Sequence, residues 1–202
     1  MKLYKLIFLL IFSLFLSPSS RGQGFSGKVI AGINASQLEG DNLKGFNKVG
    51  IHTGIGIEFF FLKNAIAIEL LFNQKGSANK VQNSGLNQRM STTLNYLQMP
   101  ILYSLNSWYN TNENFYYISI IGGGYYARLF STTSSNPGLS SFVDFFRKDD
   151  IGAVIGVQYR INKHISTSMR YDQSFLKIYN NPNNDNSGLL SYLGTVRMEY
   201  YF

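Results

Sequence analysis

The sequence has no cysteine, so it can form neither a disulfide framework nor a thiolate metal site. Charged residues make up only 14% of the chain, and the basic ones are scattered rather than clustered. That scatter offers no track for a phosphate backbone, so we expect no nucleic-acid partner. From residue 23 onwards the chain also lacks any apolar run of about 20 residues, the length that a membrane-spanning helix needs.

The first 22 residues have the layout of a cleaved secretory signal peptide. A basic start with Lys2 and Lys5 precedes the apolar stretch 6–16, and small polar residues follow it. The apolar stretch is too short for a spanning helix, which disfavours an N-terminal anchor. We therefore predict a signal peptide over 1–22 and one domain over 23–202.

What the sequence has in abundance is alternation with a period of two, which is typical of strands with one apolar face. In 49–61, Ile51, Ile55 and Ile57 share one face, while His52 and Glu58 lie on the other. Tyr (14) and Phe (16) are frequent, and both favour strands. The same pattern, strong or weak, predicts about eight strands, several of them near the length that crosses a bilayer: 28–35, 49–61, 65–73, 95–105, 115–130, 150–161, 164–172 and 191–202.

The connections between these segments alternate in length, which is a second, independent signal. Three are expected to be shorter, namely 62–64, 106–114 and 162–163. Four are expected to be longer and polar, namely 36–48, 74–92, 131–149 and 180–188, although 106–114 is no shorter than 180–188. Short periplasmic turns and longer outer loops are typical of barrels in the outer membrane of Gram-negative bacteria. We predict an all-β fold: a closed antiparallel up-and-down transmembrane β-barrel with both termini periplasmic.

A soluble barrel would alternate as well, but with its apolar face pointing inward. The composition of the polar face therefore has to distinguish a soluble barrel from a transmembrane one. That face mixes opposite charges with glycines, which fits the narrow, filled lumen of a small barrel. Buried charges need partners, so we expect Glu58, Glu69 and Glu199 to pair with arginines. The predicted lumen polar network comprises Glu58, Glu69, Gln98, Arg160, Arg170, Arg197 and Glu199. In 115–130 apolar residues occupy both parities, so the facing of that strand stays open.

The surface of the predicted barrel suggests two kinds of partner. Aromatic residues near strand ends would form girdles against outer-membrane lipid: Phe59, Phe61, Tyr103, Tyr116, Tyr159, Tyr171, Tyr192 and Tyr200. The chain ends within a strand at Phe202, on the lipid-facing parity. Such an end resembles the signal that the barrel-assembly machinery reads, and the outer loops are candidates for contact with a protein partner.

Four pieces of the chain resemble a known family. They are 28–34 (KVIAGIN), 69–76 (ELLFNQKG), 94–100 (LNYLQMP) and 152–160. They are similar to the PorT-like outer-membrane β-barrel proteins of Bacteroidetes, in which a Glu usually stands where this chain has Gln98. The resemblance implies a barrel, an association of the named member with protein secretion, and no catalytic residues.

Little in the sequence points to catalysis. The two histidines, His52 and His164, lie on different predicted strands, and no usual set of metal ligands is visible. We expect no cofactor and no enzyme activity, and a role in envelope integrity, adhesion or protein secretion. The alternatives are a small barrel enzyme acting on membrane lipid, with either histidine as its base, a passive pore, or a soluble ligand-binding β-barrel.

Overall fold

The computed structural model describes residues 24–39, 48–83, 86–134, 147–177, 179–180 and 188–202. The predicted signal peptide, and parts of the predicted connections 36–48, 131–149 and 180–188, lie outside these residues. Among the described residues, no helix is long and apolar enough to cross a membrane.

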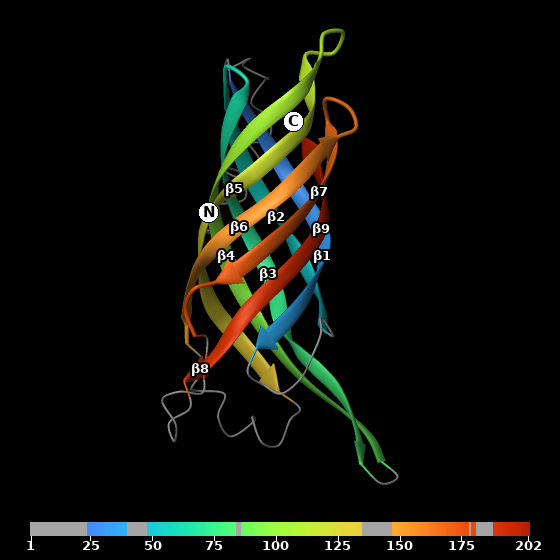
Figure 1. Cartoon of the computed structure of the whole chain (residues 1–202), viewed down its shortest axis with the longest axis vertical. Helices are drawn as coiled ribbons and strands as arrows, with labels where there is room; N and C mark the ends of the chain where they lie inside the picture. The colour runs from blue at the N-terminus through green and yellow to red at the C-terminus, as the bar shows by residue number, and fades with distance from the viewer. Residues whose placement is uncertain (1–23, 40–47, 84–85, 135–146, 178, 181–187) are drawn as a thin grey trace, which may run out of the picture.

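The described residues form eight long antiparallel strands and one short strand of two residues. Each strand pairs with its neighbour, and the pairing of β1 with β9 closes the sheet into a barrel (Figure 1). The prediction of a closed all-β barrel is therefore confirmed. The strands are β1 (Phe25–Glu39), β2 (Lys48–Phe61), β3 (Asn64–Asn83), β4 (Leu86–Asn110), β5 (Phe115–Ser134), β6 (Asp149–Arg160), β7 (Ile165–Ser174), β8 (Tyr179–Asn180) and β9 (Gly188–Tyr201).

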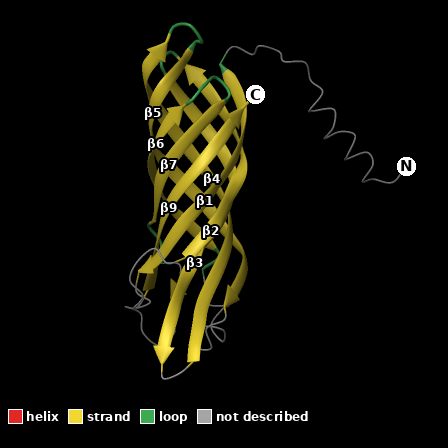
Figure 2. Cartoon of the chain, turned by 90° about the vertical axis from the view of Figure 1, so that its right-hand side faces the viewer, coloured by secondary structure: helices red, strands yellow, loops and turns green. Residues whose placement is uncertain are grey.

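The two ends of the barrel differ in their connections. We call one end the turn end, because β2–β3, β4–β5 and β6–β7 are joined there through 62–63, 111–114 and 161–164. Lys28 of β1 pairs with Tyr201 of β9, so the start of β1 and the C-terminus lie at this end too (Figure 2). The opposite end, the loop end, carries the other connections.

Two connections predicted as loops are largely strand. In 74–92, β3 and β4 stay paired from Gly76↔Thr93 to Asn83↔Leu86, beyond the last pairing of β3 with β2 at Asn73. This ribbon projects past the barrel at the loop end (Figure 1). In 106–114, β4 continues to Asn110 and only 111–114 form the turn. Both errors have one cause. Polar residues mark where the apolar wall ends, and the prediction ends the strands there. The strands continue because backbone hydrogen bonds between them do not need apolar side chains.

Exposure along the strands settles which face points outward. On β2, Ile57 is 61% exposed while the adjacent Glu58 is 3% exposed. The apolar face therefore points out and the polar face points into the lumen. The facing of β5 is resolved as well, since Ile121, Tyr125 and Ala127 are buried while Ile120 and Tyr126 are exposed.

Candidate functional site in the barrel lumen

Six charged side chains from five strands meet inside the barrel, and we call them the lumen network. Each is at most 5% exposed. The cations and carboxylates are equal in number, so their formal charges cancel. The members are Lys28 (β1), Glu58 (β2), Glu69 (β3), Arg170 (β7), Arg197 (β9) and Glu199 (β9).

Glu69 is the anionic centre of the lumen network. Arg197 donates to it through both terminal nitrogens, at 2.9 and 2.8 Å. Arg170 does the same at 3.0 and 3.1 Å, and Lys28 Nζ lies 2.8 Å from Glu69 Oε1. Paired parallel hydrogen bonds of this kind are both strong and geometrically specific, so Glu69 holds β3 against β7 and β9 across the lumen.

Lys28 is the cationic centre, and the sequence analysis did not single it out. Its ammonium lies 3.3 Å from Glu58, 2.8 Å from Glu69 and 3.0 Å from Glu199. The available signal was its parity: in 28–35 it shares a face with Asn34, which also points into the lumen. That strand alternates only weakly, so its parity is a weak signal.

Glycines on the lumen face provide the space for these long side chains. A Cβ on Gly56 would lie 3.0 Å from Cγ of Glu69 and 3.1 Å from Cε of Lys28. A Cβ on Gly156 would lie 2.8 Å from Cγ of Arg170 and 2.5 Å from a backbone oxygen. The narrow lumen thus holds the lumen network only because opposing positions lack a side chain.

A layer of neutral and acidic groups continues the polar interior. Asn73 links His52 Nδ1, at 2.9 Å, to Gln98 Oε1, to which its amide donates at 2.5 Å. Gln98 then donates to Asp172 at 2.9 Å. A glutamate in place of Gln98 would put two carboxylates in contact here. The amide of Gln98 instead donates a hydrogen bond to the carboxylate of Asp172.

Nearer the loop end, one ion pair is set among aromatic rings. Lys75 lies 3.2 Å from Asp150, and its ammonium sits 5.0 Å from the ring centroids of both Tyr96 and Tyr125. Tyr125 donates to Asp150 at 3.1 Å, and Ser174 donates to it as well. The rings of Tyr96 and Tyr125 also belong to an apolar cluster that includes Ala67, Leu94, Leu102, Ile121 and Val154.

Arg160 does not join the lumen network, contrary to the expectation that it pairs with a glutamate. It lies four residues beyond Gly156, which pairs with Arg170, and four residues of strand span about 13 Å. Among the described residues it has ring contacts only: its guanidinium sits 4.2 Å from the centroid of Tyr201 and 5.4 Å from that of Phe60. The prediction had the correct face but the wrong depth.

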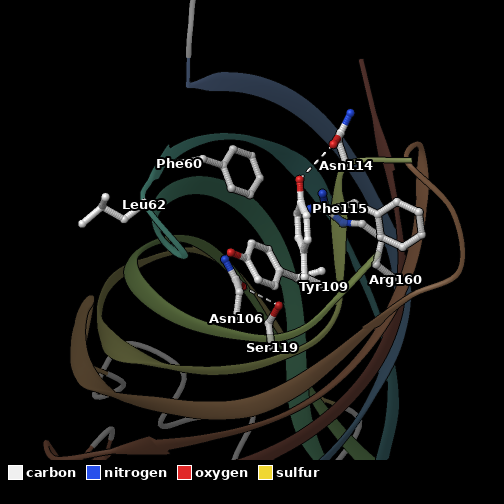
Figure 3. Close-up of a pocket in the computed structure, with 9 residues that line it drawn as sticks. Phe60, Leu62, Asn106, Tyr109, Asn114, Phe115, Ser119 and Arg160 are labelled. Atoms are coloured by element: carbon white, nitrogen blue, oxygen red, sulfur yellow. Dashed lines mark hydrogen bonds between the residues drawn. The ribbon is translucent and has the colours of Figure 1, made fainter. Parts of the chain in front are cut away.

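Arg160 instead lines a cavity of about 300 Å³ at the turn end, which we call the mouth pocket (Figure 3). The end of β2, the β4–β5 hairpin and the end of β6 surround it. Within it, Ser119 donates to Asn106 at 2.6 Å and Tyr109 donates to Asn114 at 2.9 Å. Its lining residues are Phe60, Leu62, Asn106, Tyr109, Asn114, Phe115, Tyr116, Ser119 and Arg160.

Both histidines have nitrogens engaged in structural contacts. His52 Nδ1 faces Asn73, and its Nε2 lies 3.3 Å from a nitrogen of Arg197. His164 Nδ1 lies 2.9 Å from the backbone oxygen of Tyr201, and its ring stacks on Tyr200. The described contacts join neither histidine to a serine hydroxyl or a carboxylate, the partners that a hydrolytic site would need.

A closed antiparallel barrel with an apolar outer wall and a filled polar lumen defines the class of outer-membrane β-barrel proteins. The chain belongs to the outer membrane protein beta-barrel domain family, whose model matches residues 19–180. The chain is therefore an outer-membrane protein, as the sequence predicted. None of the curated proteins compared with it matches.

Several solved barrels have a similar fold. Neisserial surface protein A is 10% identical, with a TM-score of 0.52 over 89% of this chain and 97% of its own. The attachment invasion locus protein Ail of Yersinia pestis is 16% identical, with a TM-score of 0.49 over 89% and 99%. OprG of Pseudomonas aeruginosa is 13% identical, with a TM-score of 0.48 over 89% and 96%. At these identities the likeness concerns the fold alone.

Proposed function

We propose that this protein is a non-enzymatic, non-conducting barrel that anchors a contact surface for a protein partner in the outer membrane. The observation that carries the proposal is the filled lumen, in which three buried cations and three buried carboxylates neutralise one another. A pore would need a continuous water-filled path through the lumen instead. As the role of such an anchor we propose envelope integrity, adhesion or protein secretion.

The orientation that we propose puts the turn end in the periplasm and the loop end outside. The connections of two to four residues at the turn end support this, because outer-membrane barrels have short periplasmic turns. The partner surface is then the β3–β4 ribbon with the other loop-end connections. Beyond Asn73 on β3 and Thr92 on β4, the described pairings join these two strands only to each other. Strand edges of this kind can accept a further strand from a partner.

We further propose that the chain is a PorT-like member of the wider family. Two of the pieces that carry this resemblance, 69–76 and 94–100, lie on the neighbouring strands β3 and β4. They contribute Glu69, Lys75, Tyr96 and Gln98, all buried in the lumen. The likeness therefore involves the interior packing as well as the pattern of the wall.

Conductance measurements test the proposal. We expect the purified protein, inserted in a planar lipid bilayer, to show no single-channel current above the protein-free background. A porin purified in the same detergent is the positive control. Stepwise currents from the intact protein would contradict a plugged lumen and would favour the passive pore.

A second experiment tests the role of the histidines. Since their contacts are structural, we expect a His52→Asn, His164→Asn double variant that still folds to leave envelope phenotypes unchanged relative to the wild type. Loss of the phenotype in a folded double variant would favour the enzyme that acts on membrane lipid.

A further inference from the structure

We propose that the mouth pocket binds a small organic anion, with one carboxylate or phosphate group on an apolar body, entering from the turn end. The inference concerns residues that the lumen network does not use, and it holds for either orientation of the barrel in the membrane.

Arg160 supplies the charge. The rings of Tyr201 and Phe60 lie beside its guanidinium, at 4.2 and 5.4 Å. Ring contacts of this kind use the face of the planar group and leave its edge of N–H donors available. Among the described residues no acceptor meets that edge. The edge of a guanidinium matches a carboxylate or phosphate in paired hydrogen bonds.

Tyr201 separates Arg160 from the lumen acids. Its hydroxyl lies 3.0 Å from both Glu58 Oε2 and Glu199 Oε2, and Gln158 donates to it at 2.7 Å. Those carboxylates already face Lys28. The lumen network is thus balanced without Arg160, whose positive charge stays at the mouth for another anion.

Two amides add donors to the mouth pocket. The side-chain oxygen of Asn106 accepts from Ser119, and that of Asn114 accepts from Tyr109 (Figure 3). Each amide also carries an NH₂ group that no described hydrogen bond uses. These groups add donors to the guanidinium of Arg160, which is the only charged group among the lining residues, so the mouth pocket favours an anion over a neutral or cationic ligand.

The apolar part of the pocket wall, together with the pocket volume, indicates the size and chemistry of the rest of the ligand. Phe60, Phe115 and Tyr116 contribute aromatic rings. A volume of about 300 Å³ lies at the lower end of the range for small-molecule pockets, which runs from about 300 to 1,000 Å³. A single ring or a short chain that carries one anionic group fits both the size and the chemistry.

Calorimetric titration of the detergent-purified protein tests the proposal, with phenylacetate and phenyl phosphate as probes and uncharged phenylacetamide as control. We expect saturable binding of at least one anion below ~10 mM, and at least about tenfold weaker binding of the amide. Arg160→Gln should weaken anion binding about tenfold or more, because a charge-assisted pair is lost. Arg160→Lys, which keeps the charge without the planar fork, should fall between the two.

The matched control is Arg128→Gln, since Arg128 is exposed and pairs with Asp149 near the loop end. It should bind the anions as the wild type does. Every variant is first checked for a mobility shift on boiling in a detergent gel, which reports a closed barrel. The proposal is overturned if neither anion saturates, if phenylacetamide binds equally well, or if folded Arg160→Gln binds like the wild type.

Discussion

At the scale of single residues, depth in the lumen decides what a charge does. Glu69 and Arg160 both point inward, yet Glu69 contacts three cations while Arg160 touches only rings among the described residues. Removing either partner of a buried pair leaves the other uncompensated, which costs far more than losing a charge at an exposed site. The two residues should therefore respond very differently to neutralisation.

Neutralising Glu69 should strongly destabilise the barrel. We expect Glu69→Gln to lower the free energy of unfolding by about 3–5 kcal/mol, because two arginines and Lys28 lose their shared carboxylate. Urea titration of the protein in lipid vesicles, followed by fluorescence, measures the change. Glu113→Gln, in the exposed 111–114 turn, is the control and should stay within about 0.5 kcal/mol of the wild type. Equal stability of the two variants would contradict the role of Glu69 as the anionic centre.

The glycines of the wall give a graded series. Gly156→Ala should destabilise the barrel by about 1–3 kcal/mol, because the new methyl group meets a backbone oxygen at 2.5 Å. Gly56→Ala should cost less, since the closest contact of its added Cβ, with Cγ of Glu69, is longer at 3.0 Å and does not involve the backbone. Gly122→Ala should be neutral, because nothing lies within 4 Å of its added Cβ. The same urea titration ranks the three, and a reversed order would show that lumen crowding is not what these glycines relieve.

At the scale of elements, two of the strands are longer than the barrel wall to which they belong. β3 and β4 run well past the last pairing with β2, so the ribbon adds backbone pairing without enlarging the barrel. An isolated two-stranded ribbon is marginally stable by itself. We therefore expect the ribbon to depend on the barrel, and the barrel to close without the ribbon.

Shortening the ribbon tests this dependence. Replacing residues 78–91 by Asn-Gly, the pair that favours a tight hairpin turn, joins the paired residues Ser77 and Thr92 and should preserve the closed barrel. We expect the shortened protein to keep its mobility shift on boiling and its urea midpoint. If our proposed function is right, it should also lose partner crosslinks at the loop end. A barrel that no longer closes would show that the ribbon contributes to the wall.

The sequence predicted the elements better than their contacts, for physical reasons. In a strand, neighbouring side chains point to opposite faces, so the alternation in the sequence predicts which residues of β2, β6, β7 and β9 face the lumen. Register depends on pairing between distant segments, such as Lys28 with Tyr201. Without that register the sequence does not give the depth of each lumen residue, so the predicted network groups Arg160 with Arg170 and Arg197 and omits Lys28.

At the scale of the whole molecule, the barrel is asymmetric along its axis. Its turn end carries the mouth pocket with the charge of Arg160, its middle is neutralised by the lumen network, and its loop end carries the projecting ribbon. A closed wall and a filled lumen keep these two ends chemically separate. Which end faces the periplasm therefore decides where a small anion and a protein partner would meet the molecule.

The absence of cysteine makes that orientation directly measurable, because a single introduced thiol is the only site for a maleimide label. Asn112→Cys places the thiol in the exposed turn 111–114, and Lys148→Cys places it at an exposed position just before β6, at the loop end. A membrane-impermeant maleimide applied to intact cells should label Lys148→Cys and spare Asn112→Cys. Both variants should react once the outer membrane is permeabilised, which shows that both thiols are accessible. Labelling of Asn112→Cys alone on intact cells would reverse the proposed orientation and put the mouth pocket on the outside of the cell.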